Sequence, residues 1–433
     1  MIRNTFKNFA NLKFAILLLL IISIFSSIGS LIEQNRGIEF YQNNYTNRIF
    51  GLPLWKPIVL LGLDDIYNTW WFLFILFLFG FSLVCCTFIQ QLPTLNFSRK
   101  FFFYKRANQF NKLEFKVKKT KIFQSRLNSH LLKGNYSIFQ QYNTLYAYKG
   151  LISRIGPIVV HLSILVVLLG STLGSLTGFN SQEFVPKTEL FHIQNIIRTG
   201  NFSLVDPTAF RINDFWSTYK KSGEIKQFYS DISILNGKGL EINRKTISVN
   251  NPLISHDLTF YQTDWGIVGL RFKLLNTKFI NSTLLQLPLS KIRDSNQKLW
   301  MSWLPFTKKN GLIIIIKDGR GQVQIYNKEG KFQNTLNFGE TIFNMNNIII
   351  TLLDCITSTG IQIKVDPGIN LIYFGFFFLI LSSLISYTSF SEIWLLNIKK
   401  NTQHMFGGRT NRSKISFKIE LVKLKQLFND NTI

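Results

Sequence analysis

The hydrophobic positions of this chain are concentrated in four long blocks, which cover residues 12–32, 70–89, 155–176 and 371–393. A helix needs about 20 apolar residues to cross the hydrocarbon core of a membrane, and each block reaches that length. The third block contains no Lys, Arg, Asp or Glu. The pattern therefore predicts a membrane protein with four transmembrane α-helices. The first is expected to be retained, because it is long for the apolar part of a signal peptide.

Residues 177–370, between the third and fourth blocks, follow a different pattern. Short runs alternate apolar and polar positions, as in KQFYSDISIL and LTFYQTDWGIVGLRFKL, and turn pairs such as Asn236-Gly237 and Pro367-Gly368 lie between or within them. A period of two with Gly-containing turns is typical of β-strands. We therefore expect a large all-β, sandwich-like extramembrane domain inserted between helices three and four.

The β-rich domain offers little catalytic chemistry. Its histidines have no metal-ligand spacing around them, and hydrolase, metalloprotease and phosphate-loop motifs are missing from the sequence. Asp214 and Asp231 are interpreted as solvated strand ends. The aromatic segment FYQTDWGI, at 260–267, is interpreted as core packing with satisfied polar tips. The domain is therefore expected to bind or scaffold rather than to catalyse.

The charge distribution predicts the topology. The net charge is +26, and residues 90–154 carry 13 Lys or Arg against one acid, Glu114. Such a segment could bind nucleic acid, but an excess of Lys and Arg on cytoplasmic connections accounts for it, so no nucleic acid partner is expected. The N-terminal segment 1–89 thus leads into a basic loop, 90–154. This loop, the basic tail 394–433 and both termini are predicted on the cytoplasmic or stromal side. The β-rich domain then lies on the opposite side, and Trp394 is expected to end helix four at the membrane interface.

One ionisable side chain, His161, lies inside the third apolar block, and Arg154 marks the near end of that block. Seven residues separate them, which corresponds to roughly 10 Å along a helix. Ionisable groups at membrane depth mostly face a protein interior or a pathway, although a neutral imidazole bonded to a neighbouring helix remains the structural alternative. Gly170 and Gly174 form a small-xxx-small pair that lets another helix approach closely. His161 is therefore a candidate ligand or proton-handling residue.

The three cysteines exclude a disulfide framework. Cys85 and Cys86 are adjacent in an apolar run and are predicted to be small buried side chains. Cys355 stands alone, without a second thiol nearby in sequence for redox chemistry. A Cys-x-x-Cys-His motif is missing, so the chain is not itself a c-type cytochrome.

Several segments in order resemble one known family. They are IGSLIEQN, GLDDIYNTWWF and RIGPIVVHLSILVVLLG in the membrane helices, then RINDFWSTY, GEIKQFYSDISIL, ISVNNPL and LTFYQTDWGI in the β-rich domain. This order is similar to that of the ResB or CcsB-type cytochrome c biogenesis proteins of plastids, cyanobacteria and other system II bacteria. The likeness covers residues 11–393.

The resemblance implies a membrane subunit of the system II c-type cytochrome assembly complex. This complex carries haem across the membrane and attaches it to apocytochromes c, such as cytochrome f. The family's essential membrane histidine corresponds to His161, which becomes the candidate axial ligand of haem iron or a residue that shapes where haem enters. The tryptophan-rich haem motif of the CcsA-type partner, W-G-x-x-W-x-W-D, is missing here, so the catalytic platform is expected on that partner. This chain is then a non-catalytic or co-catalytic subunit of a haem lyase complex.

The resemblance also implies a place in the cell. The plastid (chloroplast) thylakoid membrane is expected, with the chain multi-pass among membrane lipid, the β-rich domain in the lumen and both termini in the stroma. A cyanobacterial thylakoid or plasma membrane is the alternative. The alternative function is a structural membrane scaffold that holds apocytochrome or partner protein without contacting haem, and substitution of His161 distinguishes the two.

Overall fold

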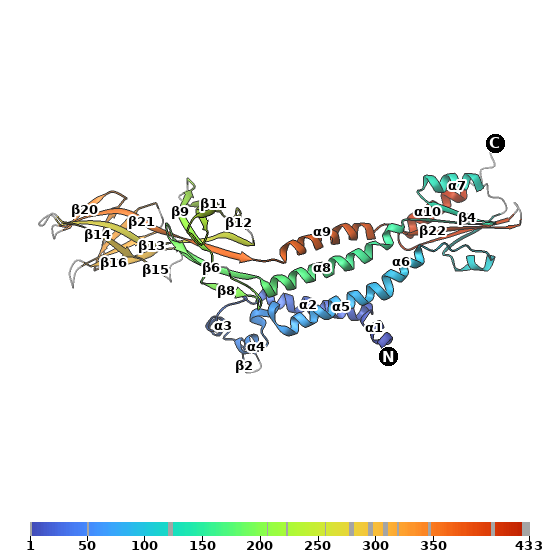
Figure 1. Ribbon diagram of the computed structural model, residues 1–433, viewed down its shortest axis with the longest axis horizontal. Helices are drawn as coiled ribbons and strands as arrows, with labels where there is room; N and C mark the ends of the chain where they lie inside the picture. Colours follow the sequence, from blue (N-terminus) through green and yellow to red (C-terminus); the bar gives the residue numbers. More distant parts are fainter. Residues whose placement is uncertain are drawn as a thin grey trace. The chain divides into compact units, whose positions relative to one another are not determined.

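The computed structural model describes residues 2–49, 52–119, 124–205, 207–221, 224–255, 257–276, 281–292, 298–305, 311–317, 320–344, 348–399 and 403–426 (Figure 1). The chain forms two compact units. The membrane unit comprises Met1–Leu173 and Gly368–Ile433, and the outer unit comprises Gly174–Pro367.

Among the described residues, four helical stretches of the chain are long and apolar enough to cross a membrane. The first is α2 (Leu12–Leu31). The second is continuous from α5 (Trp70–Cys86) through the π-helix η2 (Thr87–Gln91) to α6 (Leu92–Ser98). The third joins η4 (Leu151–Arg154) to α8 (Gly156–Thr177), and the fourth is α9 (Ile369–Ser386). The four predicted helices are therefore confirmed, and the second is longer than expected.

Short elements complete the N-terminal part of the membrane unit. They are α1 (Ile2–Phe9), α3 (Ile38–Asn44), β1 (Arg48–Ile49), β2 (Leu52–Pro53), α4 (Trp55–Leu60), η1 (Leu63–Asn68) and η3 (Ala107–Lys112). Helix α2 begins at a capped end, because the Asn11 side chain accepts a hydrogen bond from the backbone N–H of Lys13 at 3.0 Å.

The C-terminal end of helix four differs from the prediction. Helix α9 ends at Ser386, and strand β22 (Ser391–Lys399) follows. Trp394 lies in this strand, is 1% exposed, and donates its indole N–H to the carbonyl oxygen of Phe102 at 2.7 Å. The expectation that Trp394 ends the helix at the membrane interface is therefore wrong. Both faces of this strand are buried, so most of its residues are apolar and the sequence pattern does not distinguish it from the helix that precedes it.

The two basic segments fold together. Strands β3 (Phe115–Lys119), β4 (Ser137–Gln141) and β5 (Thr144–Lys149) come from the predicted loop, whereas β22 and β23 (Gln403–Thr410) come from the predicted tail. They form one antiparallel sheet in the order β3-β23-β22-β5-β4. Helices α7 (Gln124–Lys133) and α10 (Lys414–Gln426) pack on it through an apolar cluster that includes Leu131 and Phe417. We call this assembly the basic domain; the charge pattern alone did not predict that it folds.

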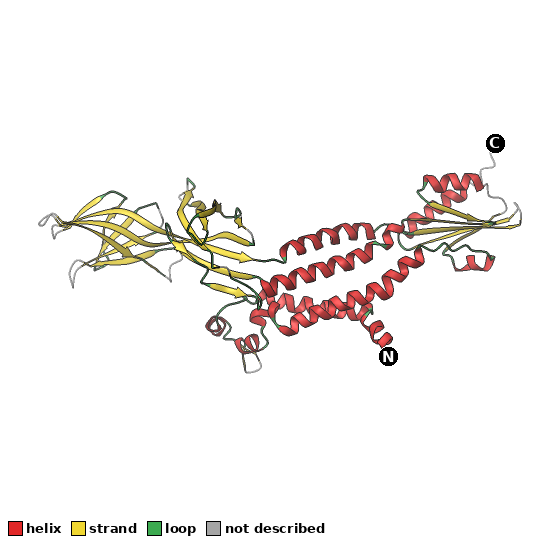
Figure 2. Cartoon of the chain, viewed as in Figure 1, coloured by secondary structure: helices red, strands yellow, loops and turns green. Residues whose placement is uncertain are grey.

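The outer unit is built on two long antiparallel strands, β13 (Leu258–Asn276) and β21 (Ile348–Val365). After the end of α8, Figure 2 shows its described residues as strands and loops. One half of the β13–β21 ladder packs on the sheet β11-β10-β9-β7, and the other half packs on the sheet β15-β16-β17-β18-β19. Phe260 and Ile363 belong to the first core, and Phe272 and Leu352 to the second. The predicted all-β, sandwich-like domain is confirmed, with two cores along one ladder.

The remaining strands of the outer unit have the following bounds. They are β6 (Phe179–Pro186), β7 (Leu190–Phe191), β8 (Ile196–Thr199), β9 (Ala209–Tyr219), β10 (Ile225–Leu235), β11 (Glu241–Ser248), β12 (Leu253–Ser255), β14 (Asn281–Pro288), β15 (Ser290–Lys291), β16 (Trp300–Pro305), β17 (Gly311–Ile316), β18 (Val323–Asn327), β19 (Phe332–Leu336) and β20 (Thr341–Asn344). The β13–β21 register shifts at three places, and such bulges bend and twist long strands.

Candidate functional site

His161 lies in the second turn of α8 and is half-buried. Its Nδ1 atom is 2.9 Å from the hydroxyl oxygen of Thr87, which is the first residue of the π-helix in the neighbouring helical segment. The structure thus brings together two side chains that are 74 positions apart in sequence. The contact joins two membrane-spanning segments through a polar pair within the membrane unit.

The hydrogen-bond network assigns the tautomer of the imidazole. The Thr87 hydroxyl donates its single proton to the carbonyl oxygen of Leu83, at 2.8 Å. With its proton on Leu83, the hydroxyl accepts from His161, whose Nδ1 then carries the proton. The other ring nitrogen, Nε2, is then left with its lone pair. In metal-binding histidines, the ring nitrogen that does not bind the metal usually donates its N–H to an acceptor.

The helix that supplies Thr87 is locally widened. The five residues Thr87–Gln91 form a π-helix between α5 and α6. Single π turns inside α-helices are rare and frequently occur at functional sites. Gln90 in this turn donates its amide to the carbonyl oxygen of Ala10 at 2.7 Å, which ties the turn to the chain preceding α2. The π turn that carries the His161 contact is therefore held on a second side.

Thr87 was not identified from the sequence. One signal was available, because Thr87 lies near the end of predicted helix two and His161 near the start of predicted helix three. Both ends border the same basic segment, so the two polar groups are expected at similar depth. A polar residue at matching depth on an adjacent helix is a natural hydrogen-bond partner in a membrane.

The residues present fit one axial ligand of haem better than a metal site made by this chain alone. Among the described residues, none of the His, Cys, Asp and Glu side chains form a group of three or more that could hold a metal ion. His161 offers one neutral imidazole with an available Nε2, and this is the donor that haem iron takes from proteins. When bound, haem would supply the iron and the reactive vinyl groups; the chain would supply the ligand and its orientation.

The opposite face of α8 packs on α9. A Cβ atom placed on Gly170 would lie 2.9 Å from the carbonyl oxygen of Gly368, and one on Gly375 of α9 would lie 2.6 Å from Cγ2 of Val167. Nine residues separate His161 from Gly170, which is half a turn beyond two turns of helix. The predicted close approach at Gly170 is therefore made to a helix of the same chain, on the side away from the histidine.

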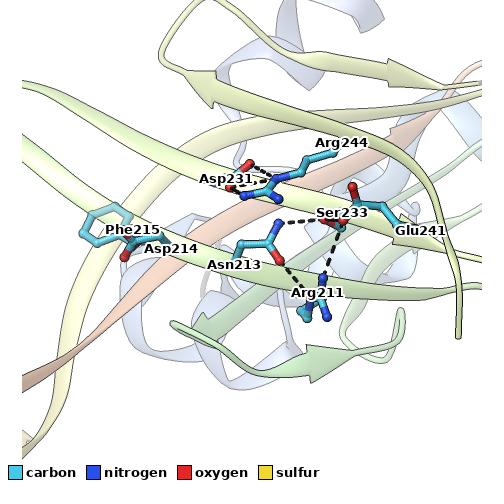
Figure 3. Close-up of polar contacts among 8 residues, drawn as sticks. All are labelled: Arg211, Asn213, Asp214, Phe215, Asp231, Ser233, Glu241 and Arg244. Atoms are coloured by element: carbon cyan, nitrogen blue, oxygen red, sulfur yellow. Dashed lines mark hydrogen bonds and ion pairs between the residues drawn. The ribbon is translucent and has the colours of Figure 1, made fainter.

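Two aspartates of the outer unit, Asp231 and Asp214, make hydrogen bonds within its sheet. Asp231 is 8% exposed and sits within β10, where its carboxylate accepts from Arg244 Nε at 3.0 Å (Figure 3). The interpretation of Asp231 as a solvated strand end is wrong. Its carboxylate is buried within the strand, and Arg244 on the neighbouring strand compensates its charge. The partner raises the pKa of Arg244 through a hydrogen bond and charge attraction. Asp214 is exposed, as expected, but lies in the middle of β9 and not at its end; its carboxylate accepts from the backbone N–H of Phe215 at 2.8 Å.

The segment 260–267 has the core role that the sequence predicted. Trp265 is 8% exposed and packs against Trp300, with ring centroids 5.1 Å apart. Gln262 is buried and donates to Thr359 Oγ1 at 2.9 Å, while Ser230 bonds the same threonine at 2.7 Å. The aromatic and polar groups here are thus satisfied by one another.

The prediction that the adjacent cysteines are small buried side chains holds for Cys85 and only in part for Cys86. Cys85 and Cys355 are buried, and Cys86 is half-buried. Cys355 lies in the larger apolar core of the outer unit, next to residues of β13. Its position is that of a small core side chain.

Comparison with known proteins identifies the family. The ResB-like family model matches residues 12–298 and 280–422. The chain is 47% identical over 423 residues to the cytochrome c biogenesis protein Ccs1 of Phaeodactylum tricornutum, covering 97% of this chain and 98% of the relative. It is 46% identical to Ccs1 of Pyropia yezoensis (97% and 94% covered) and 41% identical to CcsB of Picosynechococcus sp. (98% and 91% covered). The chain therefore belongs to the ResB-like family, whose members are membrane proteins.

Proposed function

We propose that the chain is a membrane subunit of the system II c-type cytochrome assembly complex, needed to deliver haem across the membrane and to attach it to apocytochromes c. The relatives are named cytochrome c biogenesis proteins, which supports this function. The observation that carries the mechanism is the hydrogen bond between Thr87 and His161, which leaves Nε2 of a neutral imidazole available within the membrane. His161 is the proposed axial ligand.

Each residue then has a defined task. His161 binds through Nε2, and Thr87 holds Nδ1–H so that the ring keeps one tautomer and one orientation. The π turn places the Thr87 hydroxyl where it can do this. A CcsA-type partner supplies the second axial ligand, since His161 is the one histidine within the four predicted membrane blocks of the sequence.

The topology of the proposal is supported by the basic domain. Its sheet takes strands from both basic segments, so these segments must lie on the same side of the membrane. The excess of Lys and Arg favours the cytoplasmic or stromal side for that domain and for both termini. The outer unit then faces the lumen of a thylakoid. Relatives from plastid-bearing algae and a cyanobacterium support the plastid thylakoid membrane, and reporter fusions at Asn236-Gly237 and at the C-terminus test the two sides.

The test replaces His161 in the complex co-expressed with the CcsA-type partner. We expect His161→Gly to lose most of the haem that co-purifies, measured by absorption spectroscopy, and added imidazole to restore part of it. Thr87→Val keeps the side-chain shape but removes the acceptor, so haem retention should fall roughly 10- to 100-fold. His130→Ala, on the exposed face of α7, is the matched control. Unchanged haem spectra and normal holocytochrome levels in His161→Gly would favour the scaffold function instead.

A further inference from the structure

A cavity of about 330 Å³ lies in the membrane unit where the basic domain meets the helices. The residues that line it include Thr94 of α6, Arg154 of η4, Phe390 just before β22, Glu392 of β22 and Arg409 of β23. Drug-sized ligands occupy pockets of roughly 300–1,000 Å³. This cavity is at the lower limit, so it suits one arm of a large ligand.

Arg154 in this cavity is held by an aromatic contact and not by an ion pair. Its guanidinium carbon lies 4.9 Å above the ring of Phe390, a cation–π contact that fixes the side chain. Its Nε atom is buried and has no hydrogen-bond partner. Across the described part of the chain, none of the hydrogen bonds or ion pairs involves Arg154. Arg154 is half-buried, and a buried cationic N–H without an acceptor is costly, so this side chain favours an anion beside it.

The nearest carboxylate in the cavity, that of Glu392, is already bonded to other side chains. Glu392 is 4% exposed and accepts from Arg409 Nε at 2.6 Å and from the Tyr146 hydroxyl at 2.8 Å. Both of its oxygens are therefore engaged. Its charge is cancelled by Arg409, so the lining keeps the positive charge of Arg154. Arginine presents a planar fork of donors that matches a carboxylate or a phosphate.

The cavity is aligned with the proposed ligand site. Arg154 and His161 are seven residues apart, which places them on one face of the third membrane segment and about 10 Å apart along it. The same neighbouring segment supplies Thr87 to His161 and Thr94 to the cavity. A ligand held at His161 that carries flexible carboxylate arms toward the basic side would bring them to Arg154.

We propose that the Arg154 cavity binds a carboxylate of the porphyrin, in the form of a haem propionate. This inference rests on the proposed function for its ligand. It adds Arg154 as a positioning residue that recognises the acidic edge of the ring from the basic side of the membrane. An anionic lipid headgroup presents similar chemistry, so the experiment must separate the two sources.

The test uses iron-free protoporphyrin IX and its dimethyl ester, titrated by fluorescence into the purified full-length chain in detergent. A charge-assisted hydrogen bond should make wild type prefer the free acid about 10- to 100-fold. Arg154→Gln should reduce this preference to about one. Arg154→Lys keeps the charge and should keep part of the preference, which shows that the loss in Arg154→Gln is not caused by unfolding. Arg412→Gln removes an equal charge outside the cavity, where Arg412 bonds the Ser386 carbonyl at 2.7 Å, and should change nothing.

The outcomes separate the two hypotheses, because the probe has no iron for His161 to ligate. If His161→Gly keeps the acid preference and also keeps haem in the complex, the ligand role of His161 is wrong and the Arg154 role stands. If Arg154→Gln keeps the acid preference, the carboxylate site is wrong. Loss of co-purified phosphatidylglycerol in Arg154→Gln with an unchanged acid-to-ester ratio would likewise overturn it, in favour of a lipid headgroup.

Discussion

The contact between α8 and α9 depends on a glycine that can be tested directly. Gly375 of α9 is buried. A Cβ atom there would lie 2.6 Å from Cγ2 of Val167 and 3.1 Å from the carbonyl oxygen of Ser163. Valine is stiff at χ1 and the other neighbour is backbone, so neither can move aside cheaply. The perturbation is Gly375→Ala, which adds one methyl group at this contact.

The expected change in the free energy of unfolding is the sum of two opposing effects. Alanine gains about 1 kcal/mol over glycine in a helix interior, whereas forcing a methyl group into a packed contact costs about 1–3 kcal/mol. Gly80 of α5 is the matched control, because its Cβ would meet Leu165 Cδ2 at 3.5 Å, an ordinary contact. Gly80→Ala should therefore be stabilising, and the two variants should differ by about 1–3 kcal/mol.

The assay is thermal unfolding of the purified full-length protein in detergent. With roughly 2–4 °C per kcal/mol for a domain of this size, the midpoint of Gly375→Ala should lie about 2–12 °C below that of Gly80→Ala. Haem retention in the complex should fall with it, since Ser163 follows His161 on the same helix. A midpoint for Gly375→Ala that equals or exceeds that of Gly80→Ala would refute the close packing of these helices.

Two further predictions concern charge. Arg244→Ala should lower the unfolding midpoint of the outer unit, measured by its β-sheet circular dichroism, because it leaves the buried carboxylate of Asp231 unpaired. Lys220→Ala is the control and should change the midpoint little, because it breaks an exposed ion pair. Equal effects of the two substitutions would contradict this reasoning. Burial lowers the pKa of His404 in the basic domain, so the unfolded chain takes up a proton near pH 6.5 before the folded chain does. Stability should therefore be highest above pH 6.5 and should decrease as the pH falls through the lowered folded pKa, and His404→Gln should flatten this decrease in thermal unfolding measured from pH 7.5 to 5.

The sequence by itself determined the four membrane helices, the all-β outer domain and the candidate histidine. Membrane helices can be identified from the sequence because about 20 apolar residues must occur together. Strands with one buried face can be identified because apolar and polar residues alternate along them with period two. An imidazole within such a block is conspicuous for the same reason. The end of helix four was missed because Trp394 lies in a strand buried on both faces, which hydropathy cannot distinguish from helix.

Only the tertiary structure decided how distant segments meet. The pairing of β22 with β5 joins residues that are far apart in sequence, and local patterns carry no information on such partners. The same holds for Thr87 and His161, whose hydrogen bond fixes the tautomer, and for Arg154, whose lack of a partner emerges only once Glu392 is seen to be engaged elsewhere. Residue types along the chain set which groups are available, whereas three-dimensional packing determines which of them are satisfied and which are left to bind a ligand.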